Sequence, residues 1–121
     1  MNTTKIQSLD QRRADYALQK VDSVKSDQKE YKNLSKGAPA LVMSNGLMQA
    51  LAFYRSRQKG YSTMLGQHVQ EWLYKNNLVS NPDFETAMKD LCQCDSSRYI
   101  RATDEALEIL RWIRQFADAL Y

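Results

Sequence analysis

Apolar residues recur at intervals of three and four positions near the start of the chain. The set comprises Ala14, Ala17, Leu18, Val21, Val24, Tyr31 and Leu34. This spacing places all of them along one narrow face of a helix. The helix is predicted to begin after Ser8, which has capping-box spacing to Gln11, and to end at Gly37 and Pro39. We therefore expect one long amphipathic N-terminal helix.

The next stretch, residues 39–54, is apolar on nearly every side, which is typical of a buried helix, and three basic residues at 55, 57 and 59 close it. It contains the pair Asn45-Gly46, which often forms a turn. Helix formers surround this pair, and a glycine inside a helix costs only about 1 kcal/mol relative to alanine. We predict a buried central helix that continues through Gly46 to a stop at Gly60. A break between two helices at Gly46 is the alternative.

Three more helices complete the predicted fold. They are expected over residues 61–78, from the N-cap Asn81 to about Cys94, and over residues 97–120, with a short break near Ala102 as an alternative for the last one. The chain has only 4 glycines and 2 prolines, fewer than turn-rich β architectures need. The predicted fold class is all-α: a compact bundle of about five helices joined by short loops.

A chain of 121 residues is the usual size of one domain with one hydrophobic core. We expect a single helical domain over residues 1–121, in which residues 1–8 form a flexible N-terminal tail. The N-terminus lacks the apolar stretch of a signal peptide, and no window approaches the roughly 18 apolar residues of a membrane span. The protein is therefore expected to be soluble and cytoplasmic.

The net charge of +3 conceals an uneven distribution along the chain. Residues 1–80 carry 12 basic and 6 acidic side chains, whereas residues 81–121 carry 5 and 8. A basic helical face binds the phosphate backbone of a nucleic acid with little else, although a solvated surface is the ordinary interpretation. The predicted RNA-binding residues are Arg12, Arg13, Lys20, Lys25, Lys29, Lys32, Arg55, Arg57 and Lys59. Four lysines, Lys25, Lys29, Lys32 and Lys36, are spaced to form one ridge on the first helix.

No residue set indicates catalysis or metal binding. His68 is the only histidine and precedes Glu71 by three positions, the reverse of the order in carboxylate-bundle metal sites. Cys92 and Cys94 do not complete a zinc-binding set with it. Glycine-rich phosphate loops and protease motifs are absent from the sequence. We expect no catalytic activity, no metal and no cofactor, with His68 as a partly exposed helix side chain.

Two blocks of sequence carry a family resemblance that covers about residues 9–120. The first consists of Gln11-Arg12-Arg13-Ala14, Tyr31-Lys32-Asn33-Leu34 and the run from Pro39 to Phe53; the second consists of residues 99–107 and 110–117. Both resemble the small subunit of the type III-B CRISPR effector, the fifth protein of the Cmr module. The long block from Pro39 to Phe53, with its central Asn45-Gly46, is the more specific of the two.

The resemblance implies a small all-helical subunit that stacks with copies of itself in the minor filament of a crRNA-guided ribonucleoprotein. It would help to hold the crRNA and target RNA in antiviral defence, while another subunit cleaves. The implied partners are copies of itself, other Cmr subunits and RNA, without a membrane or a small-molecule substrate. Arg12 and Arg13 match the family motif; the other RNA-binding candidates rest on charge. The alternative is a structural adaptor that makes only protein contacts, with Glu105 and Glu108 docking on a basic neighbour.

Overall fold

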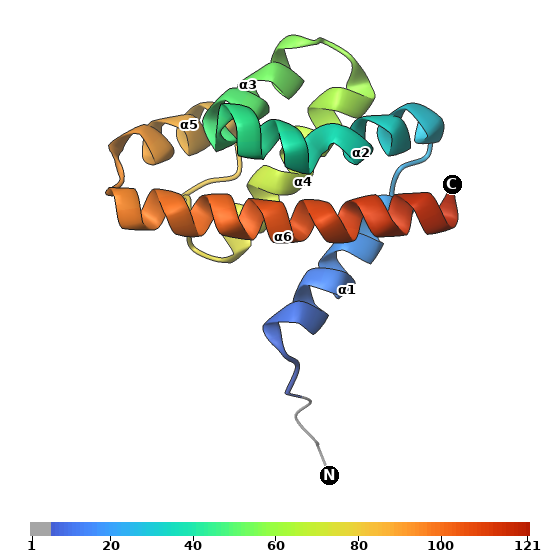
Figure 1. Ribbon diagram of the computed structural model, residues 1–121, viewed down its shortest axis with the longest axis horizontal. Coiled ribbons are helices and arrows are strands. Elements are labelled where there is room, and N and C mark those ends of the chain that lie inside the picture. The colour runs from blue at the N-terminus through green and yellow to red at the C-terminus, as the bar shows by residue number, and fades with distance from the viewer. Residues whose placement is uncertain (1–5) are drawn as a thin grey trace.

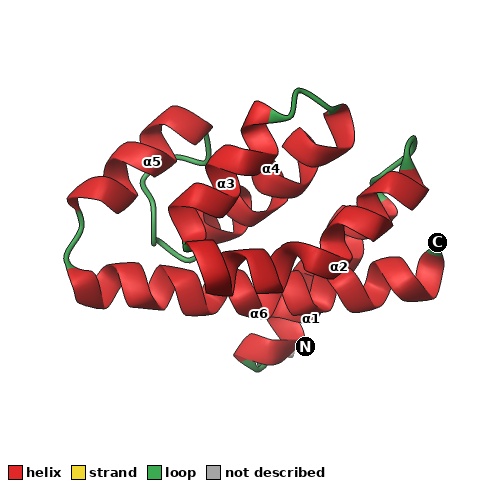
Figure 2. Ribbon diagram, turned by 45° about the horizontal axis from the view of Figure 1, so that its top comes forward, coloured by secondary structure: helices red, strands yellow, loops and turns green. Residues whose placement is uncertain are grey.

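The computed structural model describes residues 6–121, and in this range it contains six α-helices and no strand. The helices are α1 (Leu9–Asp22), α2 (Gln28–Asn45), α3 (Leu47–Ser56), α4 (Gly60–Lys75), α5 (Phe84–Gln93) and α6 (Ser96–Leu120). Short loops join them (Figure 2). The all-α bundle is confirmed, with one helix more than expected. The tail predicted over residues 1–8 falls mostly outside the described range, and Ser8 forms the predicted capping box with Gln11.

Helix α6 runs along the length of the bundle and supports most of the other helices (Figure 1). Its buried side chains are spaced by three and four and are mostly small or branched: Ala102, Ala106, Ile109, Leu110, Ile113 and Ala117. Helix α1 crosses α6, whereas α2 lies antiparallel to it, with Lys32 beside Tyr121 and Lys36 beside Asp118. The alternative break near Ala102 does not occur, because α6 is continuous.

The expected long N-terminal helix is broken between Asp22 and Gln28, so this prediction is wrong. The hydroxyl of Ser23 bonds the carbonyl of Lys20, and Asp27 adopts a left-handed backbone conformation with φ 56°. Short polar side chains compete in this way for backbone groups and favour helix ends. The break lets α1 cross α6 while α2 runs along it. The helix that follows continues through Gly37 and Pro39, which therefore do not end it.

Gly46 separates α2 from α3, so the alternative of a break at this position is confirmed. Its φ of 91° and ψ of 157° lie in a region that residues other than glycine rarely adopt. The Gly46 amide donates to the carbonyl of Val42, and the Tyr99 hydroxyl accepts from the amide of Met48 in the first turn of α3. A side chain from α6 thus caps α3, which periodicity along residues 39–59 does not reveal.

Helix α4, and not the segment 39–59, is the most buried part of the bundle. Eight of its 16 residues are buried, whereas several positions between Pro39 and Lys59 are exposed, including Met43 and Phe53. Helix α5 begins after its N-cap Asp83, two residues later than Asn81 predicts. Within residues 6–121, no helix combines the length and hydrophobicity that crossing a membrane requires.

Candidate nucleic-acid interface

One face of α1 carries Arg12, Tyr16 and Lys20, which are spaced by four residues and therefore lie in one row. This row faces the C-terminal half of α4. Tyr16 is buried there, with its ring 4.9 Å from that of Trp72 and its hydroxyl bonded to the backbone carbonyl of His68. The packed tyrosine fixes the row on α4 and leaves the two basic side chains at its ends near the surface.

Lys75 of α4 joins this row from the opposite side. Its ammonium lies 5.6 Å from the centre of the Tyr16 ring, and the ammonium of Lys20 lies 5.4 Å from the same centre. We call Arg12, Lys20 and Lys75 the basic cluster. Sequence reasoning did not select Lys75, because the signal that identifies it is the crossing of α1 over α4.

Two neighbouring hollows open at the basic cluster. The first, about 280 Å³, is lined by Arg12 and Lys75 with Asp15; the second, about 270 Å³, is lined by Lys20 and Lys75 with Glu71. Both share Tyr16, Gln19 and Lys75 as walls. Each hollow is therefore lined by two cations and one carboxylate.

The charges of the basic cluster are only partly neutralised by the protein. Lys20 is 3.5 Å from a carboxylate oxygen of Glu71, and no ion pair is found for Arg12 or Lys75 among residues 6–121. Each of the two ammonium groups is attracted by the electron-rich face of the Tyr16 ring, which does not neutralise its charge. The basic cluster therefore keeps positive charge that an anion can meet.

Arg13 follows Arg12 in the sequence but occupies a different environment. Its guanidinium donates to both carboxylate oxygens of Glu105 on α6, at 2.6 and 2.9 Å, and Trp72 Nε1 donates to Glu105 at 3.0 Å. The hydrogen bond from Arg13 lowers the pKa of Glu105, and the bond to Glu105 raises the pKa of Arg13. Arg13 is largely buried in an ion pair that joins α1, α4 and α6, so the structure separates it from the basic cluster.

The predicted lysine ridge does not form one row, because Lys25 lies in the loop before α2. The other three lysines are on α2, and two of them, Lys32 and Lys36, contact the C-terminal end of the chain. Lys32 donates to the backbone oxygen of Tyr121 at 3.3 Å, and Lys36 lies 4.0 Å from Asp118. Lys25 and Lys29 are exposed. These residues form a second basic region, on α2 and not on the α1–α4 seam.

The third predicted group, Arg55, Arg57 and Lys59, surrounds the connection between α3 and α4. Arg55 lies 5.5 Å from the ring of Phe84, and Arg57 lies 5.5 Å from the ring of Phe53. All three side chains are exposed. Lys59 lines a hollow of about 520 Å³ that also includes Glu71, so this group reaches the N-terminal end of the same helix that carries Lys75.

His68 is buried, with only 5% of its surface exposed, so the expectation of a partly exposed side chain is wrong. Burial and the nearby charge of Lys20 lower its pKa to about 4. Its Nδ1 lies 2.8 Å from the hydroxyl of Tyr31. In the part of the chain that the structure describes, no three His, Cys, Asp or Glu side chains are close enough to hold a metal ion.

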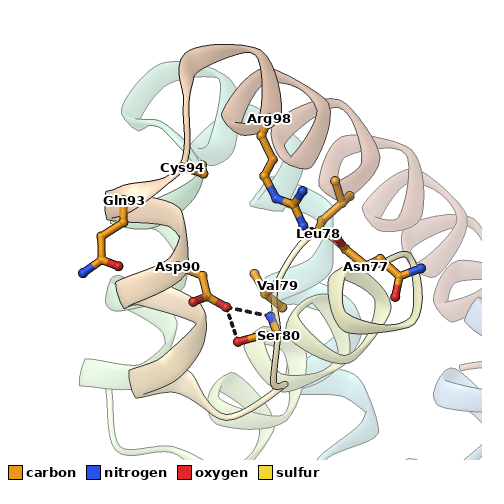
Figure 3. A pocket seen from close by; sticks show the side chains of 8 residues that line it. All are labelled: Asn77, Leu78, Val79, Ser80, Asp90, Gln93, Cys94 and Arg98. Atoms are coloured by element: carbon orange, nitrogen blue, oxygen red, sulfur yellow. Dashed lines mark hydrogen bonds between the residues drawn. The ribbon is translucent and has the colours of Figure 1, made fainter.

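The hollow between the α4–α5 loop, α5 and α6 has polar walls that are already paired (Figure 3). Asp90 accepts hydrogen bonds from the amide and hydroxyl of Ser80, and Arg98 donates to the backbone oxygen of Asn77. These bonds hold the loop against α5 and α6. The arrangement serves structure, and the basic cluster remains the better candidate for binding.

The acidic C-terminal third does not offer the predicted docking pair. Glu105 is held inside the fold by Arg13 and Trp72, and Glu108 is 2.9 Å from Arg111 on the same helix. Of the two, Glu108 is the more accessible to another protein.

Comparisons with known proteins identify the family. Residues 9–120 match the family model described as CRISPR-associated protein (Cas_Cmr5). The CRISPR system Cmr subunit Cmr5 of Thermus thermophilus is 31% identical over 91 residues, which is 75% of each chain. The crystal structure of a CRISPR-associated Cmr5 family protein from Thermus thermophilus aligns with a TM-score of 0.82 at 29% identity, covering 95% of this chain and 98% of that one. The resemblance found in the sequence is confirmed, and the chain belongs to the Cmr5 family of CRISPR-associated proteins.

Proposed function

We propose that this chain is a non-catalytic small subunit of a crRNA-guided type III-B ribonucleoprotein and holds the backbone of the crRNA–target RNA in antiviral defence. Membership of the Cmr5 family and the name of the Thermus relative, a subunit of the Cmr system, support the assignment to such a complex. Its partners would be other Cmr subunits, copies of itself stacked in a filament, and RNA. Sequence recognition would rest on base pairing by the guide.

The observation that carries the RNA-binding proposal is the convergence of Lys20 and Lys75 on the ring of Tyr16. The ring is buried in the core, so it offers a fixed surface to both ammonium groups. Lys75 is exposed and Lys20 is half-buried, so both cations are near the surface, where a phosphate can reach them. Arg12 extends the cluster by one more cation along α1.

The second contact region proposed is the group Arg55, Arg57 and Lys59. Lys59 precedes the first turn of α4 and Lys75 ends its last turn, and 16 residues of helix span roughly 24 Å. Glu71, between these two ends of α4, lines both the hollow that includes Lys59 and the hollow that includes Lys75. A strand of RNA lying along α4 would therefore meet phosphate-binding side chains at both ends of the helix.

The salt dependence of RNA affinity tests this proposal. Replacing Arg12, Lys20 and Lys75 together by alanine removes up to three phosphate contacts, each worth roughly 0.7 in the slope of log affinity against log salt for a single strand. We expect the slope to fall by about 2. The measurement is made with single-stranded RNA and the full chain, and repeated in the assembled complex.

A matched control removes three exposed cations that lie outside the basic cluster and line none of the hollows described above. Lys89, Arg101 and Arg114 are exposed on α5 and α6, and none of them is found in an ion pair within residues 6–121. Their triple alanine variant changes the net charge by the same amount. An equal fall in slope for both triple variants, or no fall for the first, would overturn the assignment of the basic cluster.

A further inference from the structure

We infer that the hollow at the N-terminal end of α4 binds one nucleotide unit of the RNA, with its phosphate at Lys59 and its base over Met64 and His68. This inference rests on the proposed RNA-binding function and adds a second kind of contact to it. The hollow measures about 520 Å³, within the roughly 300–1,000 Å³ typical of small-molecule sites. It is lined by Gln58, Lys59, Gly60, Thr63, Met64, Gln67, His68 and Glu71.

The phosphate end of the site is the first turn of α4. Lys59 occupies the N-cap position in extended conformation and its side chain makes no capping hydrogen bond. Nothing lies within 4 Å of the place where Gly60 would carry a side chain, so its backbone is open to approach. Free amides and a positive dipole end, together with an adjacent lysine, favour a phosphate group.

His68 is the independent feature that points to a ligand. The residue is buried, with 5% of its surface exposed, yet it lines the hollow. Nδ1 is bonded to the hydroxyl of Tyr31. Nε2 has no hydrogen-bond partner among the described residues. It also keeps some contact with the surface, since the one fully buried side-chain atom found without a partner in residues 6–121 is Thr103 Oγ1. A buried imidazole thus presents an unused polar atom to the hollow.

The tautomer of His68 follows from its partner. Tyr31 is fully buried, and among residues 6–121 its hydroxyl has His68 Nδ1 as the acceptor for its proton. When the phenol donates its proton to Nδ1, Nδ1 acts as an acceptor and carries no proton. The single proton of the neutral imidazole ring then lies on Nε2. The low pKa of His68, about 4, keeps the ring neutral at neutral pH. In this tautomer Nε2 of His68 is a neutral donor that is available to a ligand in the hollow.

The remaining walls suit a heteroaromatic base. The Met64 thioether is a favourable contact for an aromatic ring. Glu71 follows His68 by three residues and lines the same hollow; one oxygen of its carboxylate lies 3.5 Å from Lys20, and the carboxylate keeps further acceptor capacity. The edges of all four bases carry donors and acceptors side by side, so this pair suits any of them. The site is expected to tolerate every base, as a subunit that follows a variable guide requires.

The test compares intact RNA with RNA of the same length that has abasic sites throughout. Met64→Ala removes the contact with the base, worth about 1 kcal/mol or a fivefold change in affinity. We expect a fivefold loss for intact RNA and no change for the abasic strand, measured by fluorescence anisotropy on the full chain. Met88→Ala is the matched control, because Met88, like Met64, is half-buried against the core and lines none of the hollows described above. Equal effects of Met64→Ala on both strands, or no effect on either, would overturn the inference.

A second measurement needs no substitution and separates this inference from the proposed function. The methyl resonance of Met64 is followed while nucleoside monophosphates or ribose 5-phosphate are added to the wild-type chain. Nucleotides are expected to shift it and ribose 5-phosphate is not; equal shifts, or none, contradict a base site. The proposed function is tested separately, by the abasic strand. It is supported if this strand binds in a salt-dependent way and loses affinity when the basic cluster is replaced, regardless of the result for Met64.

Discussion

The two sides of α1 bring neighbouring arginines into opposite environments. On the side toward α6, Arg13 is locked to Glu105 by two hydrogen bonds, and Trp72 bonds the same carboxylate. On the side toward α4, no ion pair is found for Arg12 among the described residues, and it lines an open hollow with Lys75. The same motif of two arginines thus provides one internal ion pair and one cation available to a ligand.

The difference shows how a basic helix is divided between stability and binding. A positive charge that is neutralised within the fold adds little to the attraction of a polyanion. An unpaired, exposed positive charge adds much more. Counting basic residues in the sequence treats Arg12 and Arg13 as equal. The position of Glu105, 92 residues further along the chain, decides between them.

The largest effect on the stability of the fold should come from lowering the pH. As the pH falls, His68 of α4 should respond before Glu105 of α6 does. The folded state holds His68 neutral with a pKa of about 4, against 6.5 in the unfolded chain, because of burial and the charge of Lys20. The unfolded chain therefore takes up the proton first, and stability is lost as the pH falls from 6.5 to 4, by about 3 kcal/mol. Urea denaturation at intervals of pH measures this loss.

Glu105 responds to acid in a different range. Its pKa is lowered by the hydrogen bond from Arg13, so its contribution is complete above its ordinary value of 4.5 and is lost only as the pH falls through the lower folded value. A His68→Asn variant should lose the dependence between pH 6.5 and 4.5 and keep the one below. A wild-type chain equally stable at pH 6.5 and 4.5 would show that His68 is not held neutral.

Removing Arg13 should have the next largest effect. Arg13→Ala leaves the carboxylate of Glu105, with a side chain only 13% exposed, without its cationic partner. We expect a loss of about 2 kcal/mol in the free energy of unfolding, from the cost of an unpaired group in a largely buried site. Chemical denaturation at pH 7 gives the value.

Arg111 supplies the control for this variant. It pairs with Glu108 at 2.9 Å, but the two side chains are 54% and 36% exposed. Surface pairs of this kind contribute roughly 0.5 kcal/mol, so Arg111→Ala should change little. Equal losses for the two variants would mean that the contact between α1 and α6 has no special role in the stability of the fold.

The sequence predicts the helical class and most helix positions, because apolar periodicity reports which faces are buried. It does not predict the two breaks. The first follows from Ser23 and Asp27, which favour a helix end, but their effect depends on α1 having to cross α6. The second requires Tyr99, from α6, to cap the first turn of α3 beside Gly46. Both depend on contacts between residues far apart in the chain.

The candidate site shows the same limit. Arg12 and Lys20 are identifiable as basic residues on a helix, and their spacing places them on one row with Tyr16. Lys75 becomes their neighbour only through the crossing of α1 and α4. Periodicity describes one helix at a time, so it identifies members of a site on one element and misses those contributed by another.

The smallest effect on stability, and the most direct test of the comparison, belongs to Arg12. Because Arg12 is exposed, Arg12→Gln should change the free energy of unfolding by less than about 0.5 kcal/mol. It should nevertheless lower the salt slope of RNA binding by roughly 0.7, the share of one phosphate contact on a single strand. Arg12→Lys keeps the charge and should keep the slope. If Arg12→Gln destabilises the fold as Arg13→Ala does, or leaves the slope of the wild type, the two sides of α1 do not divide stability from binding.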